Sequence, residues 1–111
     1  MNTAATPTTV PYVPQIRLYQ NWLRDQRALS FETYNDLWRW SVTDLEGFWQ
    51  SIWDYFELES PTPHKAALSK NVMPGAVWFE GAKTNYAHQV LRHVQAAHAA
   101  GFPAVISLNE K

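Results

Sequence analysis

Apolar residues recur every three or four positions in two stretches after residue 14, which is the spacing of an amphipathic helix. The first stretch predicts a helix over about residues 15–28. The apolar face of this helix is formed by Ile16, Tyr19, Trp22 and Leu23. The second stretch predicts a helix that Ser30 caps, because a Ser side chain can accept a hydrogen bond from a backbone N–H of the first turn. The apolar face of the second helix is formed by Phe31, Tyr34, Leu37 and Trp38.

The clearest helical pattern begins at Thr43. Thr43 and Glu46 have the spacing of a capping box, in which the Thr hydroxyl accepts from the N–H of Glu46 and the Glu carboxylate accepts from the N–H of Thr43. Pro61 and Pro63 end the segment. The apolar positions between them follow the helical period and are Leu45, Phe48, Trp49, Ile52, Trp53 and Phe56. This pattern predicts a third helix.

The second half of the chain is less regular. Residues 60–84 contain three Pro and two Gly, which predicts an extended, irregular stretch. Trp78 and Phe79 are expected to anchor this stretch to a helical surface, because polar loops seldom carry such rings. Asn85 can cap a final helix, and Gly101 is placed to end it. The apolar face of the final helix is formed by Tyr86, Val90, Leu91, Val94 and Ala97.

Together these patterns predict a mainly α fold with about four amphipathic helices, a long irregular segment and one short terminal strand. The strand is Ala104–Leu108. A single strand has no ladder partner, and even an isolated two-stranded hairpin is marginal in water. We therefore expect the partners of this strand to belong to sequence outside the chain. Residues 1–14 carry four Thr and three Pro without any period, which predicts a flexible tail.

Composition excludes several classes of function. Nine basic and ten acidic residues give a net charge of -1, which provides no electrostatic basis for binding nucleic acid or anionic lipid. No stretch approaches the roughly 18 apolar residues of a membrane span, and the first residues lack the features of a secretory signal. The absence of Cys excludes disulfides, thiol catalysis and cysteine metal sites. We expect a cytoplasmic protein that binds neither nucleic acid nor membranes.

Aromatic residues are unusually frequent in this chain, with six Trp, five Tyr and five Phe. Three rings left exposed would form a patch of about 450–750 Å², which reaches or exceeds the largest patch of a typical monomer. Two interpretations remain open: the rings form an ordinary core, or some of them lie against a partner. The main apolar stripes predict Trp38, Trp49 and Trp53 as core residues. Trp40 and Trp78 lie off these stripes and are candidates for docking on a partner.

One glycine-containing run superficially has the composition of a phosphate-binding loop. A phosphate loop has four residues between its glycines and a Lys directly after the second glycine. Here five residues separate Gly75 from Gly81, and Ala82 precedes Lys83. The bulky rings within the run would also keep the backbone away from a phosphate. We therefore expect the glycines to serve as turn residues in an anchoring loop.

Two sets of titratable side chains lack the spacing of a functional site. The first set recurs every five residues on the final helix and consists of His88, His93 and His98. Five residues turn a helix by about 500°, so these side chains spiral around the helix instead of converging on a metal ion. The second set lies near the end of the third helix and consists of Asp54, Glu57, Glu59 and His64. No partner for acid–base chemistry is identifiable among them, and we predict no catalytic, cofactor-binding or metal-ligating residue in this chain.

Three motifs, in this order and at this spacing, resemble the amino-terminal region of the acetoacetyl-CoA synthetases. These motifs are Leu37–Val42, Phe48–Asp54 and Met73–Ala87. The acetoacetyl-CoA synthetases are relatives of the acetyl-CoA synthetases in the acyl-adenylate-forming ligase superfamily. The resemblance covers residues 16–109. It implies that residues 15–103 form the helical amino-terminal domain of an acyl-CoA synthetase, and that residues 104–111 begin its large adenylating domain and are cut short.

In that family, this region is a helical cap on the large adenylating domain of an α/β enzyme, and that domain would be its partner. The complete enzyme uses ATP and magnesium to form an acyl-adenylate, and then passes the acyl group to the thiol of coenzyme A. All of its catalytic motifs come later in the chain, so no site residue is carried over. The resemblance implies an amino-terminal fragment of an ATP-dependent acetoacetate–CoA ligase, which supplies packing and scaffold and is inactive alone. The alternatives are a stand-alone helical protein-interaction module and a small enzyme or ligand-binding protein.

Overall fold

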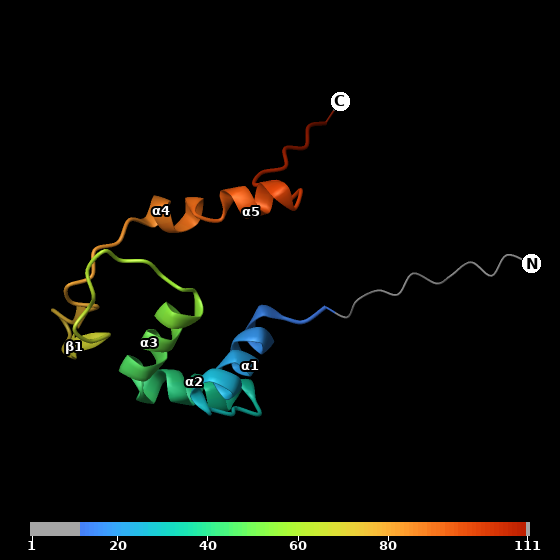
Figure 1. Ribbon diagram of the computed structural model, residues 1–111. Helices are drawn as coiled ribbons and strands as arrows, with labels where there is room; N and C mark the ends of the chain where they lie inside the picture. Colours follow the sequence, from blue (N-terminus) through green and yellow to red (C-terminus); the bar gives the residue numbers. More distant parts are fainter. Residues whose placement is uncertain (1–11, 111) are drawn as a thin grey trace, which may run out of the picture. The chain divides into compact units, whose positions relative to one another are not determined.

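The computed structural model describes residues 12–110 of the 111-residue chain. Most of the predicted tail, residues 1–11, lies outside the described residues. Figure 1 shows a mainly helical fold with one small sheet, which confirms the predicted fold class. The chain divides between Asp44 and Leu45 into two compact units, and each unit is described by itself.

The first unit begins with helix α1 (Gln15–Arg27), which confirms the first predicted helix. It ends where Ala28 takes a left-handed φ of 55°. The apolar residues that the helix buries are Tyr19 and Leu23. Ile16 was predicted on the same face but is 43% exposed. The buried face is therefore narrower than the apolar pattern suggests.

The second helix, α2 (Tyr34–Thr43), begins later than the sequence predicts. Thr33 caps it, and the prediction that Ser30 would do so is wrong. The Thr33 hydroxyl accepts a hydrogen bond from the N–H of Asp36 at 3.2 Å, and the Asp36 carboxylate accepts one from the N–H of Thr33 at 3.3 Å. This is a capping box in which Asp stands in place of the usual Glu or Gln.

The second unit opens with helix α3 (Leu45–Tyr55), which confirms the third predicted helix. The capping box predicted between Thr43 and Glu46 is wrong. Thr43 is the last residue of α2, and its hydroxyl donates to the backbone oxygen of Arg39 at 2.8 Å. A residue that is itself helical cannot take the extended conformation of an N-cap.

Helix α3 ends through its own backbone geometry and does not depend on the prolines that follow. Glu57 has a left-handed φ of 50°. The N–H of Leu58 bonds to the oxygen of Trp53 at 3.1 Å, and the N–H of Glu57 bonds to the oxygen of Asp54 at 3.1 Å. This is the Schellman pattern that closes many helices. The chain therefore leaves the helix before it reaches Pro61.

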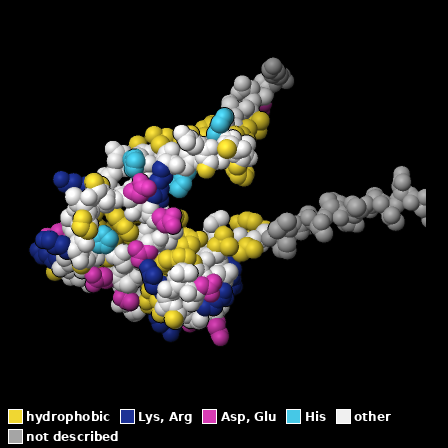
Figure 2. Space-filling view, in the orientation of Figure 1, with side chains coloured by type: hydrophobic (Ala, Val, Ile, Leu, Met, Phe, Trp, Pro, Cys, Tyr) yellow, Lys and Arg dark blue, Asp and Glu magenta, His cyan; other side chains and the backbone are white. Residues whose placement is uncertain are grey.

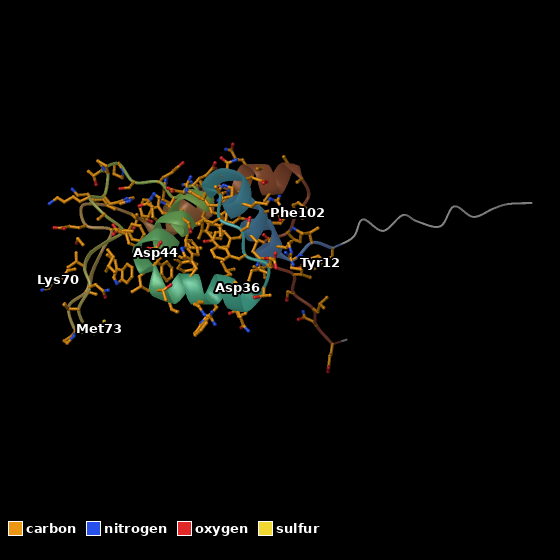
Figure 3. All side chains as sticks on the ribbon, turned by 90° about the horizontal axis from the view of Figure 1, so that it is seen from below. Tyr12, Asp36, Asp44, Lys70, Met73 and Phe102 are labelled. Atoms are coloured by element: carbon orange, nitrogen blue, oxygen red, sulfur yellow. The ribbon has the colours of Figure 1, made fainter. Side chains whose placement is uncertain are left out.

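The stretch predicted to be irregular contains a small antiparallel hairpin, which the sequence analysis missed. Strand β1 (Leu68–Lys70) pairs with β2 (Val77–Trp78), with an irregularity in the register. The connection contains a cis peptide bond before Pro74. Lys70 and Met73 lie at the outer end of the hairpin in Figure 3. No period-2 alternation marks strands this short, so the usual signal for a strand is absent.

Hydrogen bonds beyond the two strands continue the pairing towards Gly81. The N–H of Phe79 bonds to the oxygen of Ala67 at 3.0 Å, and the N–H of Lys65 bonds to the oxygen of Glu80 at 2.9 Å. Gly81 then takes a left-handed φ of 95°, and a Cβ there would lie 3.2 Å from the backbone oxygen of Pro63. This glycine therefore serves as the turn residue that the sequence predicts.

The final predicted helix is present as two short helices, α4 (Tyr86–Leu91) and α5 (Val94–Ala99). Asn85 caps α4, because its side-chain oxygen accepts from the N–H of His88 at 3.0 Å. Gly101 follows α5 with a left-handed φ of 77°. Both predicted ends of this helical stretch are thus confirmed, while the break in its middle was not predicted.

The predicted strand at Ala104–Leu108 is absent from the structure, which shows no regular element there. The sheet formed within residues 12–110 has two strands, and neither pairs with this segment. An extended segment forms no strand without a ladder partner. None of the described helices combines the length and apolar character needed to cross a membrane.

The position of the capping box can be tested with a matched pair of variants. Thr33→Ala should lower the free energy of unfolding by about 1 kcal/mol, because it leaves an N–H in the first turn of α2 without its acceptor. Thr43→Ala should cost less than about 0.5 kcal/mol, as expected away from caps and cores. Urea unfolding of the 111-residue chain measures both, and a larger cost for Thr43→Ala would restore the cap predicted from the sequence.

Candidate functional site

Aromatic side chains of α3 and of the hairpin region form the most concentrated cluster in the second unit. The rings of Trp53 and Phe79 stack with centroids 4.9 Å apart. The His64 ring meets both edge-on, at 4.9 Å from Trp53 and 5.1 Å from Phe79. Trp49 and Trp78 meet edge-on at 6.1 Å. We call these five residues the aromatic cluster. The predicted anchoring of the irregular stretch by Trp78 and Phe79 is therefore confirmed.

The structure corrects which tryptophans are buried. Trp38 is 53% exposed and Trp49 is 41% exposed, so neither is the core residue that the sequence predicts. Trp53 is half-buried. In α3, the face that carries Trp49 is only partly covered by Trp78, which is itself 42% exposed. Trp78 thus keeps the exposure expected of a docking residue.

Trp40 is half-buried within the first unit and does not have the free ring expected of a docking residue. Its ring stacks on Phe31 with centroids 5.2 Å apart, and its Nε1–H donates to Asp44 at 3.3 Å. Trp40 lies three residues after the buried Leu37, so the two share one face of α2. Trp38 follows Leu37 directly and points elsewhere. The sequence analysis placed Trp38 in the core and Trp40 on the surface, which is the reverse of the structure, because it extended the helix back to Phe31.

An apolar groove of 430 Å³ lies beside the aromatic cluster. We call it the aromatic groove, and its apolar walls are Trp49, Ile52, Trp53, Leu58, Phe79 and Tyr86. Thr84 and Gln89 add the polar groups of its lining. Grooves of this size and character bind small apolar ligands or the side chains of another protein. The lining offers no carboxylate, imidazole or amine, so the arrangement suits binding and not acid–base catalysis.

The predicted acid–base set is divided between two places. His64 and Asp54 both hydrogen-bond to Gln50, and within this network they do not bond to each other. A carboxylate only accepts, so the Gln50 amide N–H donates to Asp54 at 3.0 Å and its oxygen accepts from His64 Nε2 at 2.6 Å. A neutral amide between them cannot take up a proton as a base does. This network therefore fixes the His64 ring against Trp53 and does not form a proton-transfer pair.

Glu59 belongs to a second polar cluster that joins the end of α3 to α4. Arg92 donates to the backbone oxygens of Phe56 and Glu57, which are carbonyls at the end of α3. Arg92 also lies 3.4 Å from a Glu59 carboxylate oxygen, and the His88 ring donates to the other oxygen at 3.0 Å. We call Glu59, His88, Gln89 and Arg92 the α4 clasp.

Gln89 completes the α4 clasp through the backbone of Glu59. Its side-chain N–H donates to the oxygen of Glu59 at 2.6 Å, and its side-chain oxygen accepts from the N–H of Glu59 at 3.2 Å. The sequence analysis missed Gln89 and Arg92, because their partners lie about thirty residues earlier in the chain. For Arg92 the available signal was that the carbonyls at the end of a helix need donors, which Arg can supply.

The α4 clasp lowers the pKa of the Glu59 carboxyl below its ordinary value of 4.5. The largest cause is the hydrogen bond from the His88 ring, and the positive charge of Arg92 adds to it. Both interactions favour the ionised carboxylate. Glu59 is exposed, so water and salt screen the interaction.

The remaining candidates do not assemble into a metal or phosphate site. His88 is held in the α4 clasp, and His93 accepts from the Arg92 side chain at 3.3 Å. No group of three potential metal ligands occurs within residues 12–110. In the predicted anchoring loop, the N–H of Lys83 donates to the Ser60 hydroxyl at 2.9 Å, and the Thr62 hydroxyl donates to the Gly81 oxygen at 2.5 Å. These bonds hold the loop to the chain that follows α3.

Comparisons with known proteins point to one family. The family model described as "Acetyl-coenzyme A synthetase N-terminus" matches residues 34–90, which is just over half of the chain. An acetoacetyl-CoA synthetase from Macaca fascicularis is 34% identical over 68 residues, which cover 60% of this chain and 10% of that protein. The malonamoyl-CoA synthetase vrtB from Penicillium aethiopicum is 29% identical over 105 residues, which cover 92% of this chain and 14% of that protein.

A solved structure shows the same likeness. The acetoacetyl-CoA synthetase from Streptomyces lividans superposes with a TM-score of 0.65 at 36% sequence identity. The match covers 71% of this chain and 12% of that chain. This chain therefore spans about a tenth of the length of the relatives that it matches.

The order of burial among three tryptophans predicts the order of their stability costs. Trp53→Ala should cost about 3 kcal/mol, at the lower end of the range for removing a buried large ring, because Trp53 contacts both Phe79 and His64. Trp49→Ala should cost about 1–2 kcal/mol for its partly buried ring. Trp38→Ala should cost less than about 1 kcal/mol. Urea unfolding gives all three values, and equal costs would support the core predicted from the sequence.

The lowered pKa of Glu59 predicts how the α4 clasp depends on pH. The ionised carboxylate stabilises the folded state above pH 4.5, and this stabilisation is lost as the pH falls through the lower folded-state pKa. The difference in unfolding free energy between the parent chain and Glu59→Gln should therefore be largest above pH 4.5 and shrink below it. Glu32→Gln, at an exposed position, is the control. A difference that grows as the pH falls would contradict the assigned interactions.

Proposed function

Because this chain belongs to the family of acetyl-coenzyme A synthetase N-terminal regions, we propose that it is the amino-terminal segment of an ATP-dependent acetoacetate–CoA ligase. The observation that carries the proposal is the match of residues 34–90 to that family, together with acetoacetyl-CoA synthetases among the similar proteins. The ligase would form an acyl-adenylate from ATP with magnesium and then transfer the acyl group to coenzyme A. These cofactors would bind outside the 111 residues.

The role of this segment within the ligase is packing and scaffold. The apolar residues buried within residues 12–110 are Tyr19, Leu23, Leu37 and Ala67. Many larger apolar side chains remain exposed, including Trp78 and Phe102. Such a surface suits a segment that lies against a larger protein body, because monomeric proteins seldom leave so much apolar area uncovered. The adenylating domain of the ligase is the proposed partner.

The second candidate function is a stand-alone interaction module. The aromatic groove favours it, because a preformed apolar groove with few polar groups can receive side chains of a separate protein. The two functions differ in what the gene encodes. A module would act as a separate polypeptide, whereas a ligase segment is joined to the adenylating domain.

The coding DNA beyond codon 111 provides the test of the ligase. The reading frame, expressed whole, should release pyrophosphate from ATP when acetoacetate and coenzyme A are present. Acetate and malonamate serve as comparison acids, because synthetases of other short acids share this region. The 111-residue chain alone should release none. A reading frame without an adenylating domain would contradict the proposed ligase function. Faster pyrophosphate release with another acid would mean that the proposed substrate, acetoacetate, is wrong.

A further inference from the structure

The four residues before α1 form a Pro-x-x-Pro pattern. They are Pro11-Tyr12-Val13-Pro14, and we call them the proline segment. Proline restricts its own φ and favours the polyproline II conformation, which is extended and has no internal hydrogen bonds. Pro14 has a φ of -58° and a ψ of 144°, close to the values of polyproline II, about −75° and 145°. The pattern and the backbone of Pro14 therefore both indicate polyproline II.

The proline segment is attached firmly to α1 but leaves its side chains uncovered. The oxygen of Pro14 accepts hydrogen bonds from the N–H groups of Arg17 at 2.9 Å and Leu18 at 3.2 Å, in the first turn of α1. Tyr12 is 83% exposed and Val13 is 43% exposed. Figure 2 shows hydrophobic side chains, in yellow, where the described chain begins. The helix thus holds one end of the segment, while its apolar side chains face solvent.

The aromatic groove has the features of surfaces that bind polyproline II segments. Such segments bind to grooves lined with aromatic rings, and four rings line this groove: Trp49, Trp53, Phe79 and Tyr86. A polyproline II backbone keeps its carbonyls free to accept hydrogen bonds. The indole N–H of Trp53 can donate one, because it has no partner within residues 12–110 and no buried side-chain nitrogen or oxygen is left unpaired there.

The groove and the proline segment also match in charge. The lining of the aromatic groove includes no Asp, Glu, Lys or Arg, and residues 2–16 contain none of these either. A charged side chain would lose much hydration free energy on entering an apolar groove, whereas an uncharged segment loses little. The groove therefore favours a neutral segment of this kind over an acidic or basic ligand.

We propose that the aromatic groove binds the proline segment of a second copy of this chain, so that two copies exchange segments reciprocally. Within one copy, residues 15–44 tether the segment to the unit that carries the groove, whereas a second copy presents its segment free of that tether. Reciprocal exchange uses the same surfaces in both copies and closes as a two-fold dimer. This self-association goes beyond the proposed function, which concerns the chemistry of the ligase.

Reciprocal exchange buries enough area for a specific dimer. The ring of Tyr12 alone can bury about 150–250 Å². With the neighbouring side chains of the segment and the walls of the groove, the two contacts together cover about 1,200 Å². That area is at the lower end of the range for specific interfaces, so the dimer should be weak and reversible.

Sedimentation equilibrium of the 111-residue chain tests the dimer directly. The parent chain should be largely dimeric at about 500 µM and dissociate on dilution, as expected for a small interface. A parent chain that stays monomeric at this concentration would overturn the proposal. This includes the case in which the segment occupies the groove of its own copy.

Two variants of the 111-residue chain identify the surfaces. Tyr86→Ala removes a wall of the groove, and the double variant Pro11→Ala, Pro14→Ala removes the Pro-x-x-Pro pattern. Each should raise the dissociation constant of the dimer at least about tenfold, because an aromatic anchor or its ligand is lost. Tyr34→Ala is the matched control, since Tyr34 is 63% exposed on α2 and lies outside both surfaces. A dimer that neither variant weakens would overturn the proposal.

Mixing the two variants separates reciprocal exchange from a general loss of structure. The Tyr86→Ala chain keeps an intact segment, and the double Pro variant keeps an intact groove, so a mixed pair retains one of the two contacts. The mixture should therefore associate at least about threefold more tightly than either variant alone. Association no tighter than that of the separate variants would contradict the exchange.

A labelled peptide of residues 3–14 tests the groove without relying on the dimer. Measured by fluorescence anisotropy, it should bind the Tyr34→Ala control at least about tenfold more tightly than the Tyr86→Ala chain. The whole ligase should bind the peptide within about threefold of the 111-residue chain, because an accessible groove keeps its lining. Loss of binding in the whole ligase would overturn the proposal, whereas failure to release pyrophosphate would overturn the ligase function alone.

Discussion

The structure of the second unit depends on which groups bond to the backbone carbonyls at the end of α3. A helix leaves carbonyls at its end without partners, and here the guanidinium of Arg92, the residue after α4, donates to the carbonyls of Phe56 and Glu57, the two residues that follow α3. One turn earlier in α3, Trp53 stacks on Phe79 and thereby fixes the chain that follows the hairpin. Both connections start from the short stretch between Trp53 and Glu57, where α3 ends. The aromatic groove exists because these two attachments place α3, the hairpin region and Tyr86 around one space.

The sequence predicted those features that local chemistry determines. Asn85 caps a helix because its side chain bonds within the first turn, and Gly101 ends one because it adopts a left-handed φ. The predictions failed at two helix starts. Thr33 forms the capping box of α2 with Asp36, where Ser30 was expected. Thr43 has the same spacing to Glu46 but is the last residue of α2, so it cannot cap α3. Because the start of α2 was placed wrongly, the predicted environments of Trp38 and Trp40 were exchanged.

The polar contacts of the candidate site could not be predicted from the sequence, for a different reason. Gln50 separates His64 from Asp54, and a glutamine between two titratable groups is recognised only once its two hydrogen bonds are seen. The α4 clasp joins residues about thirty positions apart, and no periodic pattern carries such information. The same holds for the hairpin, whose strands are too short to show alternation. The sequence therefore predicts helical faces but not polar pairs between residues that are far apart in the chain.

The aromatic groove and the stretch after Arg92, the two apolar surfaces of the second unit, differ in how firmly the chain holds them. The aromatic groove is bordered by polar groups that already bond within the chain, so its shape is set before anything binds. Residues 93–109 carry no Asp, Glu, Lys or Arg, and helix α5 within them buries none of its residues. A preformed groove can accept an occupant and release it. Helices α4 and α5 bury none of their residues, so the α4 clasp is what holds the start of this stretch to the chain that follows α3.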